Sequence, residues 1–505
     1  MARGFASGQG GTVAERLMLG IDQGGSGSRA VLIDEGGRVR GYGYRPLARI
    51  SPRPGWVEQR PAAVARSVRE AIAEALARAR CDPRAVAACG ITSQRDTTFA
   101  WDRRSGRPIG NAITWQDLRT APLVEEAGSW AHGDERRARL GQFPGAYSSA
   151  MHMAWRMRHD EPFRHAAESG RLLVSLAAGW LVRALGQPAE HALDYSLLQA
   201  MTVFDPRRRA LWDEWVNFLA IPRAALPAPR PTLHQFGELN LGGAAAPVTA
   251  MIADQQAGLF GYDCRRRGEA AATHGTASFV NVVAGADAPP QGVCKTYLAW
   301  ELGGEPAYTL EADMTVTGAA VRWLTQMRLI RRAGDLDTLA GGVPGSDGVV
   351  FVPAFTGLGV PTEDRSARGT ILGMTLGTTP GHLARAFLES IGCQLRDILD
   401  TMEREGGVSI GQLRVGGGLS NSDVACQIQA DVAGVTIVRA RDTETSARAA
   451  ALLAGLGAGV WAGPAALPPL LDGSERVFEP RLPPEQRAEL VGRWRRAVER
   501  ARGWA

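Results

Sequence analysis

The feature that most constrains this fold is a pattern of strand, tight glycine-rich turn and strand that occurs in each half of the chain. Near the N-terminus, the apolar residues 17–22 precede a turn at 24–28, and a second strand is expected over 29–34. Residues 269–283 repeat this order around a turn at 273–278. The repetition indicates a duplicated fold.

Helical and strand patterns alternate in both halves, as in α/β folds. Apolar residues recur at helical spacing over 61–80, and the proline at its start suits a first helical position. The other principal elements that we expect are strands over 86–92, 247–253 and 411–415, and helices over 318–330, 382–403 and 446–460.

The length of 505 residues exceeds the size at which single hydrophobic cores stop growing, so we expect two domains. Residues 1–16 are rich in glycine and small polar residues and lack the apolar core of a secretory signal, so we expect a disordered leader. The expected domains cover 17–260 and 261–465, and 466–505 form a partly helical tail.

Composition excludes several classes of protein. Apolar residues make up 45% of the chain, but no apolar run approaches the length of a membrane span. The six cysteines are scattered without a C-x-x-C pair, which favours a reduced, cytoplasmic protein without a zinc site. The net charge of +5 is spread along the chain and interleaved with acidic residues, so nucleic acid is not an expected partner.

One lysine, Lys295, occurs in the whole chain. A Walker A loop needs lysine after glycine, whereas Lys295 follows Val293-Cys294, so a P-loop is excluded. The lysine motif of protein kinases is also missing. If the protein binds ATP, backbone N–H groups, hydroxyls and a carboxylate-bound metal must hold the phosphates.

Three glycine-rich turns are candidates for phosphate binding. The first follows Asp22, a carboxylate suited to Mg²⁺, and the second contains Gly275-Thr276. The third, residues 416–418, lies between an expected strand and helix, where nucleotides often bind. A plain hairpin turn or strand-to-helix connection remains the alternative for each.

Two polar positions follow expected strands. Asp254 comes directly after the strand 247–253 and before a helix, so it is either a helix N-cap or a general base. Arg95-Asp96 follows the strand 86–92 and is either part of a binding site or a surface ion pair of little energetic value. The residues alone leave both choices open.

Several blocks over residues 17–461, in order and at similar spacing, resemble the FGGY family of carbohydrate kinases, and its glycerol-phosphorylating members most closely. GIDQGGSGSRAVLID resembles the family's first phosphate loop, PGWVEQRP its P-G-W-V-E segment, and THGTASF its second phosphate loop. GITSQRDTTFAWD and NAITWQD resemble its polyol-binding blocks, and IADQQAGLFG resembles its catalytic block. VPAFTGLGVP and ARGTILGMT resemble its C-terminal signature.

The resemblance implies two actin-like (ribonuclease H-like) α/β domains with a nucleotide cleft between them. It also implies that Asp254 is the catalytic base and that Asp22 holds Mg²⁺ on the phosphates of ATP. The implied substrate-binding residues are Arg95, Asp96, Trp115, Tyr147, Asp254, Gln255 and Phe279. The implied nucleotide-binding residues are Gly24, Gly25, Ser26, Gly275, Thr276, Gly318, Arg322, Gly418 and Ser422.

The sequence departs from the family pattern at a few of these positions. Asp96 replaces a glutamate, which opens about one methylene of space beside a hydroxyl-binding carboxylate. His152 replaces a lysine of the substrate region. The remaining departures lie in the nucleotide region: Gly25 and Ser26 for threonines, Gly27 for a serine, Gly416 for an aspartate and Ser422 for an asparagine.

The expected function is ATP-dependent phosphorylation of a hydroxyl of glycerol. The alternatives are a kinase of another polyol or sugar, such as a tetritol, pentitol or ketopentose, an actin-like ATPase without a small-molecule acceptor, and a non-catalytic sensor. The polyol-binding blocks argue against the ATPase, and retention of both Asp22 and Asp254 argues against the sensor. The sequence does not decide whether the protein forms a homo-oligomer.

Overall fold

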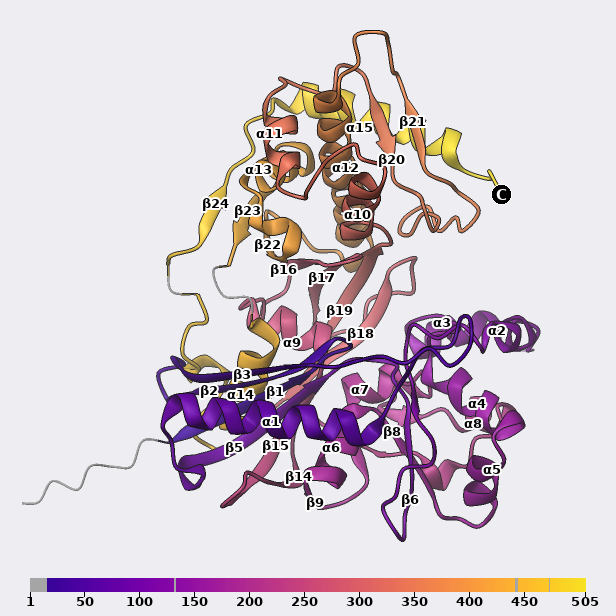
Figure 1. Ribbon diagram of the computed structural model, residues 1–505, viewed down its shortest axis with the longest axis vertical. Helices are drawn as coiled ribbons and strands as arrows, with labels where there is room; N and C mark the ends of the chain where they lie inside the picture. Colours follow the sequence, from indigo (N-terminus) through magenta and orange to yellow (C-terminus); the bar gives the residue numbers. More distant parts are fainter. Residues whose placement is uncertain (1–15, 131–132, 441–443, 472) are drawn as a thin grey trace, which may run out of the picture.

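The computed structural model of the chain describes residues 16–130, 133–440, 444–471 and 473–505. The expected leader, 1–16, lies outside the described residues apart from Arg16. The described chain is organised around two large mixed β-sheets, one above the other along the longest axis of the molecule (Figure 1). The expectation of two α/β domains is therefore confirmed.

The first sheet contains seven strands among the described residues. Strand β1 pairs antiparallel with β2 and parallel with β5, and β5 pairs parallel with β15. The strand order is β3 (Val39–Pro46), β2 (Gly27–Ile33), β1 (Leu17–Gln23), β5 (Val86–Ser93), β15 (Ala245–Ala253), β14 (Leu233–Asn240) and β9 (Gly186–Pro188).

The second sheet repeats this arrangement, again with seven described strands. Strand β16 pairs antiparallel with β17 and parallel with β22, and β22 pairs parallel with β23. The strand order is β18 (Lys295–Leu302), β19 (Glu305–Met314), β17 (Ser278–Gly285), β16 (Ala270–His274), β22 (Gln412–Gly417), β23 (Thr436–Arg439) and β24 (Arg476–Phe478). The two halves thus share a central arrangement of one antiparallel pair beside two parallel strands, as the repeated turns indicated. The outer strands differ, because β2 pairs with the next strand, β3, whereas β17 pairs with β19.

Helices cover the faces of both sheets. In the first domain, α1 packs on β2 and β3, and its apolar stripe includes Val64, Val68 and Ile72. In the second domain, α12 packs on α11 and α13, and its capping box begins at Thr379. The helices of the first half are α1 (Pro61–Ala79), α2 (Ala121–Gly128), α3 (Gly133–Leu140), α4 (Ser149–His159), α5 (Glu161–Glu168), α6 (Ala177–Leu185), α7 (Tyr195–Ala200), α8 (Asp213–Phe218) and α9 (Asp254–Gly261). Those of the second half are α10 (Gly318–Gln326), α11 (Asp335–Gly341), α12 (Pro380–Gly406), α13 (Asp423–Ala433), α14 (Thr445–Gly457) and α15 (Pro484–Ala501).

Short ladders complete the described structure. They are β4 (Glu58–Gln59) with β7 (Ala112–Ile113), β6 (Phe99–Asp102) with β8 (Leu172–Ser175), β10 (Ala192–Asp194) with β13 (Ala228–Arg230), β11 (Phe204–Asp205) with β12 (Ala210–Leu211), and β20 (Val350–Val352) with β21 (Thr370–Leu372). The expected tail also takes part in the second domain, because β24 extends its sheet and Trp494 of α15 is buried in its core. None of the described helices is long and apolar enough to cross a membrane.

Helix α14 connects the two domains. It follows the second sheet in sequence but packs on β1 and β5 of the first, and Figure 1 shows it in gold among the indigo strands. A Cβ atom on Gly20 or Gly90 would lie about 2 Å from a backbone oxygen of α14, so only glycine permits this approach. A buried apolar cluster of α9, α14 and residues from both sheets fills the space between the domains.

Candidate active site

The carboxyl ends of three neighbouring parallel strands, β1, β5 and β15, bring the expected catalytic residues to one edge of the first sheet. Asp22 lies opposite Thr92 in the β1–β5 register, and Ala253 lies opposite Ser93 in the β5–β15 register. The ends of these strands therefore place Asp22, Arg95-Asp96 and Asp254 at the same edge of the sheet. In open α/β sheets, this edge is where ligands bind.

Asp254 is the first residue of α9, and Ala253 occupies the N-cap position. The N-cap alternative is therefore wrong, although Oδ1 of Asp254 does accept a hydrogen bond from the backbone N–H of Gln255 at 2.8 Å. Arg95 Nε lies 3.6 Å from the same oxygen. Burial raises the pKa of Asp254 to about 6, and Arg95 limits the rise. A carboxylate with this pKa is a suitable general base near neutral pH.

Arg95 is not a surface residue. Its side chain is 11% exposed, and Nη2 donates to Oε1 of the fully buried Glu311 at 3.0 Å. Its guanidinium carbon also lies 4.9 Å from the centroid of the Tyr297 ring. The surface ion-pair alternative for Arg95-Asp96 is therefore wrong, since Arg95 joins Asp254 to Glu311 of the second domain.

Asp96 has an unusual backbone conformation and an unusual environment. Its φ is +61°, in the left-handed region that few residues other than glycine, Asn and Asp adopt. Its side chain is buried, and Oδ1 has no hydrogen-bond partner among the described residues. Burial raises the pKa of Asp96 to about 8, while Arg95 and Lys295 oppose the rise. Such a conformation and an unpaired buried oxygen are typical of binding sites.

The first glycine turn joins β1 to β2 and is closed by the Gly24 N–H, which donates to the Gly27 oxygen at 2.9 Å. Asp22 precedes it, 3.6 Å from Arg29 Nη1. Burial raises the pKa of Asp22 to about 7, and the carboxylates of Asp254 and Glu444 add to this rise against Arg29. At the tip of the turn, Gly25 is partly exposed and Ser26 is exposed.

This excess of negative charge fits a divalent cation. No cluster of three potential metal ligands occurs among the described residues. Mg²⁺ does not require one, because it usually binds through one or two carboxylates together with phosphates and water. Asp22 beside a phosphate-binding turn fits that mode of binding.

The second glycine turn is supported by α10. The Gly318 N–H donates to the Gly275 oxygen at 3.0 Å, and the Ala319 N–H donates to the Thr276 oxygen at 3.1 Å. A Cβ atom on Gly318 would lie 2.5 Å from the Gly275 oxygen, which explains the glycine at this position. The structure thus brings three of the expected nucleotide-binding residues together.

The remaining expected nucleotide residues lie around the third turn and α10. Gly418 follows β22, and a Cβ atom added to it would meet no other atom within 4 Å. The preceding Gly417 has φ +89° and lies against the backbone of His274. Arg322 is exposed one helical turn after Gly318, on the same face of α10. Ser422 instead caps α13, accepting from the Ala425 N–H at 2.9 Å, and donates to Asp337 of α11.

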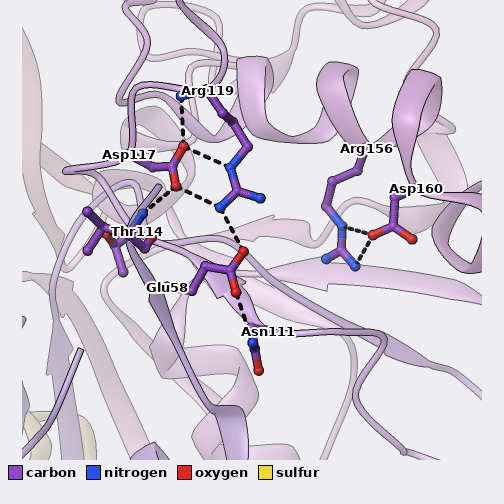
Figure 2. Close-up of polar contacts among 8 residues, drawn as sticks. Glu58, Asn111, Thr114, Asp117, Arg119, Arg156 and Asp160 are labelled. Carbon is purple, nitrogen blue, oxygen red and sulfur yellow. Dashed lines mark hydrogen bonds and ion pairs between the residues drawn. The ribbon is translucent and has the colours of Figure 1, made fainter. Parts of the chain in front are cut away.

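Trp115 is 45% exposed, and its Nε1 lies 3.6 Å from the position that a Cβ atom on Gly25 would take. A buried network holds the loop that carries it (Figure 2). Arg119 donates to Asp117 at 2.7 and 2.8 Å and to Glu58 at 2.7 Å. These contacts hold the loop in place, with the Trp115 indole exposed beside the first glycine turn.

The other expected substrate residues lie around the same centre. Tyr147 donates its hydroxyl to the Phe143 oxygen at 2.8 Å, and the charges of Lys295 and Asp96 influence its pKa, which burial raises. Phe279 is partly buried on β17, and Gln255 is partly buried on α9. His152 is buried and bonded to Thr98 Oγ1 through Nδ1 at 2.9 Å, and burial lowers its pKa to about 3. This histidine is a neutral core residue.

Four polar residues at the site, all from β18 and β19, were missed by sequence reasoning. Glu311 binds Arg95, and Lys295 Nζ lies 3.1 Å from Asp313 Oδ1. Tyr297 lies under Arg95 and donates its hydroxyl to Gln142 Oε1 at 2.7 Å. Lys295 and Tyr297 are two residues apart on β18, and Glu311 and Asp313 are two residues apart on β19, so each pair lies on one face of its strand. This alternation was the signal in the sequence that pointed to a polar strand face.

The fold and this edge define a two-domain α/β protein in which a glycine-rich turn begins each half and a buried carboxylate with a raised pKa lies at the carboxyl edge of the first sheet. Residues 17–261 match the N-terminal domain of the FGGY family of carbohydrate kinases, and residues 270–458 match its C-terminal domain. The chain belongs to this family and is an ATP-dependent carbohydrate kinase.

Relatives and solved structures agree with this assignment. The chain is 42% identical to a glycerol kinase of Aromatoleum aromaticum, over 96% of this chain and 99% of the relative. It is 40% identical to a glycerol kinase of Symbiobacterium thermophilum, over 97% and 99% of the two chains. The crystal structure of Plasmodium falciparum glycerol kinase with ADP superposes with a TM-score of 0.91 at 26% identity, covering 96% of this chain and 98% of that one.

Proposed function

We propose that the protein transfers the γ-phosphoryl group of ATP to a terminal hydroxyl of glycerol or a closely related polyol, giving glycerol 3-phosphate and ADP when glycerol is the acceptor. The observation that carries the proposal is Asp254, a carboxylate with a pKa of about 6 beside Arg95 at the carboxyl edge of the first sheet. The full-length similarity to glycerol kinases supports the choice of acceptor.

In this mechanism, a primary hydroxyl of the polyol donates a hydrogen bond to Asp254. As its oxygen attacks the γ-phosphorus, the bond to the β–γ bridging oxygen breaks, ADP leaves, and the hydroxyl proton passes to Asp254. Arg95 keeps Asp254 ionised and orients it, because its Nε lies 3.6 Å from Oδ1. Trp115 and Phe279 cover the carbon edge of the acceptor.

The two glycine turns hold the phosphates through backbone N–H groups, since the chain's one lysine lies elsewhere. Gly24, Gly25 and Ser26 approach from the first domain, while Gly275 and Thr276 approach from the second. Asp22 would hold Mg²⁺, which would supply positive charge to balance the negative charge of the phosphates, including the charge that develops on the leaving ADP. Gly318, Gly418 and Arg322 line the rest of the nucleotide pocket.

The same proposal covers the location of the enzyme. We place it in the cytoplasm, where a reducing environment suits its six free thiols, five of them buried. ATP and a small polyol are then available together.

The test is ADP release by the purified full-length protein with glycerol, erythritol, ribitol, xylitol or dihydroxyacetone, and without an acceptor. Acceptor-dependent ADP release together with a phosphorylated polyol in the products would support the proposal. Equal ADP release with and without an acceptor would show an ATPase instead and would overturn it.

A further inference from the structure

The polar residues of β18 and β19 form one continuous surface beside the catalytic edge. Lys295 lies opposite Glu311 in the β18–β19 register, and Phe279 of β17 lies opposite Asp313. Residues in register share one face of a sheet, as do residues two apart on one strand. Lys295, Glu311 and Asp313 therefore lie on the same face as Phe279, the residue expected to cover the substrate.

This surface is joined to the catalytic base by direct contacts. Arg95 lies 3.6 Å from Asp254 Oδ1 on one side and 3.0 Å from Glu311 Oε1 on the other. The next pair along the surface is Lys295 with Asp313, at 3.1 Å. A ligand that begins at Asp254 and extends along Arg95 thus reaches Glu311 and then the Lys295–Asp313 pair.

Three polar atoms along this path are buried without a hydrogen-bond partner among the described residues. They are Arg95 Nη1, Asp96 Oδ1 and Glu311 Oε2. Buried polar groups without a partner are costly, so a run of them indicates a missing ligand. One guanidinium donor and two carboxyl oxygens match hydroxyl groups, each of which donates one hydrogen bond and accepts others.

The charges on this surface favour a neutral ligand. The carboxyl groups of Asp96, Glu311 and Asp313 face the two cations Arg95 and Lys295, and Asp254 adds a further carboxylate. Burial alone would lower the pKa of Lys295, but Asp313 raises it, so the ammonium keeps its charge within the pair. A sugar acid or phosphorylated acceptor would add negative charge to a surface that already has an excess, whereas a polyol would not.

The surface is also fixed relative to the first domain. The Thr296 N–H of β18 donates to the Gly141 oxygen at 2.8 Å, and Gln199 of α7 donates to the Thr296 oxygen at 2.6 Å. The Leu298 N–H donates to Gln199 Oε1 at 2.8 Å. Because these contacts hold β18 in place, the positions of Lys295 and its neighbours are set before substrate binds.

We propose that Lys295, Glu311 and Asp313 form a second hydroxyl-binding subsite and that the enzyme prefers an unbranched polyol of four or five carbons over glycerol. This inference rests on the proposed function and names its substrate class. A three-carbon acceptor held at Asp254 leaves the Lys295–Asp313 end without a hydroxyl, while a longer polyol places one there. The shorter Asp96 gives room for the additional carbon.

The test compares kcat/KM for glycerol, erythritol and ribitol in the parent and in the double variant Lys295→Met, Asp313→Asn. The double change removes both charges of the pair, so neither is left buried alone. The matched control is Arg156→Met, Asp160→Asn, which neutralises a partly buried pair between α4 and the residue that follows it, joined at 2.7 Å and visible in Figure 2.

We expect erythritol or ribitol to exceed glycerol in kcat/KM by about tenfold or more in the parent, as expected for a polar site that rejects a ligand lacking one hydroxyl. The Lys295/Asp313 double variant should reduce this ratio at least tenfold, and the Arg156/Asp160 variant should keep it. The inference would be overturned if the kcat/KM of the parent for glycerol equalled that for both longer polyols. An unchanged ratio of longer-polyol to glycerol kcat/KM in the folded double variant would also overturn it.

If the double variant does not fold, a second variant and a binding measurement on the parent still test the inference. In Asp96→Glu, the additional methylene narrows the same space, so the ratio of erythritol to glycerol kcat/KM should fall. Calorimetric binding of each polyol to the parent should give the same order of preference, and tighter binding of glycerol would contradict the inference. Absence of phosphorylation of every polyol would instead refute the proposed function.

Discussion

In the proposed mechanism, Asp254 must be basic enough to accept a proton and yet remain ionised where it is buried. Burial works against ionisation, and the neighbouring carboxylate of Glu311 adds to this effect. Arg95 opposes both, because it lies between Asp254 and Glu311 and contacts each. The result is a pKa of about 6, between that of a free carboxylate and the pH of the cell. In the proposed mechanism, Arg95 therefore contributes to catalysis as well as to binding.

The first prediction concerns the base itself. Asp254→Asn should lower kcat by about a hundredfold or more, since the amide keeps the shape of the side chain but cannot accept the proton. Binding of a non-hydrolysable ATP analogue, measured by calorimetry, should stay within about threefold, because Asp254 lies on the acceptor side of the cleft. A variant with kcat within tenfold of the parent would show that another group is the base.

The pH dependence of kcat/KM for the polyol should report the same carboxyl group. Asp254 must be deprotonated to act as a base, and its raised pKa of about 6 means that it gains a proton as pH falls through this value. We expect kcat/KM to fall about tenfold per pH unit as the pH drops below 6. A profile that stays flat to pH 4.5, where the protein is still folded, would contradict this assignment.

At the scale of elements, the site depends on close backbone contacts between a turn and a helix. Helix α10 begins at Gly318, and its first N–H groups bind the oxygens of Gly275 and Thr276. The second phosphate turn is therefore held by the helix that follows β19. This contact fixes the backbone of the turn, and a fixed backbone is what the proposed phosphate binding through N–H groups requires.

The contact between α10 and the turn can be tested with one methyl group. In Gly318→Ala, the new Cβ atom would lie 2.5 Å from the Gly275 oxygen, so the turn or the helix must shift. We expect KM for ATP to rise about tenfold with little change in the affinity for the polyol. Gly345→Ala is the control, because its added Cβ atom would meet no other atom within 4 Å and its φ is not positive. Equal KM values for ATP in the two variants would show that the contact does not shape the turn.

Local patterns in the sequence predicted the elements that carry the catalytic edge. The strand ending before Asp254, the turns after Asp22 and around Gly275, and the repeated topology followed from glycine spacing and apolar runs. The period of two in β18 and β19 places Lys295 and Glu311 each on one face of its strand, but it does not reveal which face meets the other domain. Strand register and domain placement are long-range properties that a single sequence does not specify locally.

At Ser422, the contacts in the structure differ from those that the sequence pattern suggested. Its place after the third glycine turn suggested a nucleotide contact, but in the structure its hydroxyl caps α13 and binds Asp337. Serine is a strong N-cap residue, and the capping role satisfies a backbone N–H that would otherwise have no partner at the helix start. The nucleotide-binding role of Ser422 therefore stays a prediction.

At the scale of the whole molecule, the two domains are joined in two different ways. Around α9 and α14 they share an apolar core, in which Gly261 lies so close to Thr445 that a Cβ atom would be 2.2 Å from its oxygen. Elsewhere, polar contacts tie β18 to the first domain, including the 3.0 Å ion pair of Arg209 with Glu301 in the same strand. Asp254 on α9 and Lys295 on β18 belong to elements that these contacts join, whereas Figure 1 shows α10–α13 further from the first domain.

The last prediction follows from this arrangement. We expect the outer part of the second domain to close over the first around a hinge near Gly261 when both polyol and nucleotide are bound, because the phosphate turns must meet across the cleft and exclude water. Small-angle scattering should show a smaller radius of gyration with polyol plus a non-hydrolysable ATP analogue than without ligands. Polyol alone should give little of this change, since its pocket is already assembled. An unchanged radius of gyration with both ligands bound at saturation would mean that the cleft is preformed, and the water would then have to be excluded by the side chains alone.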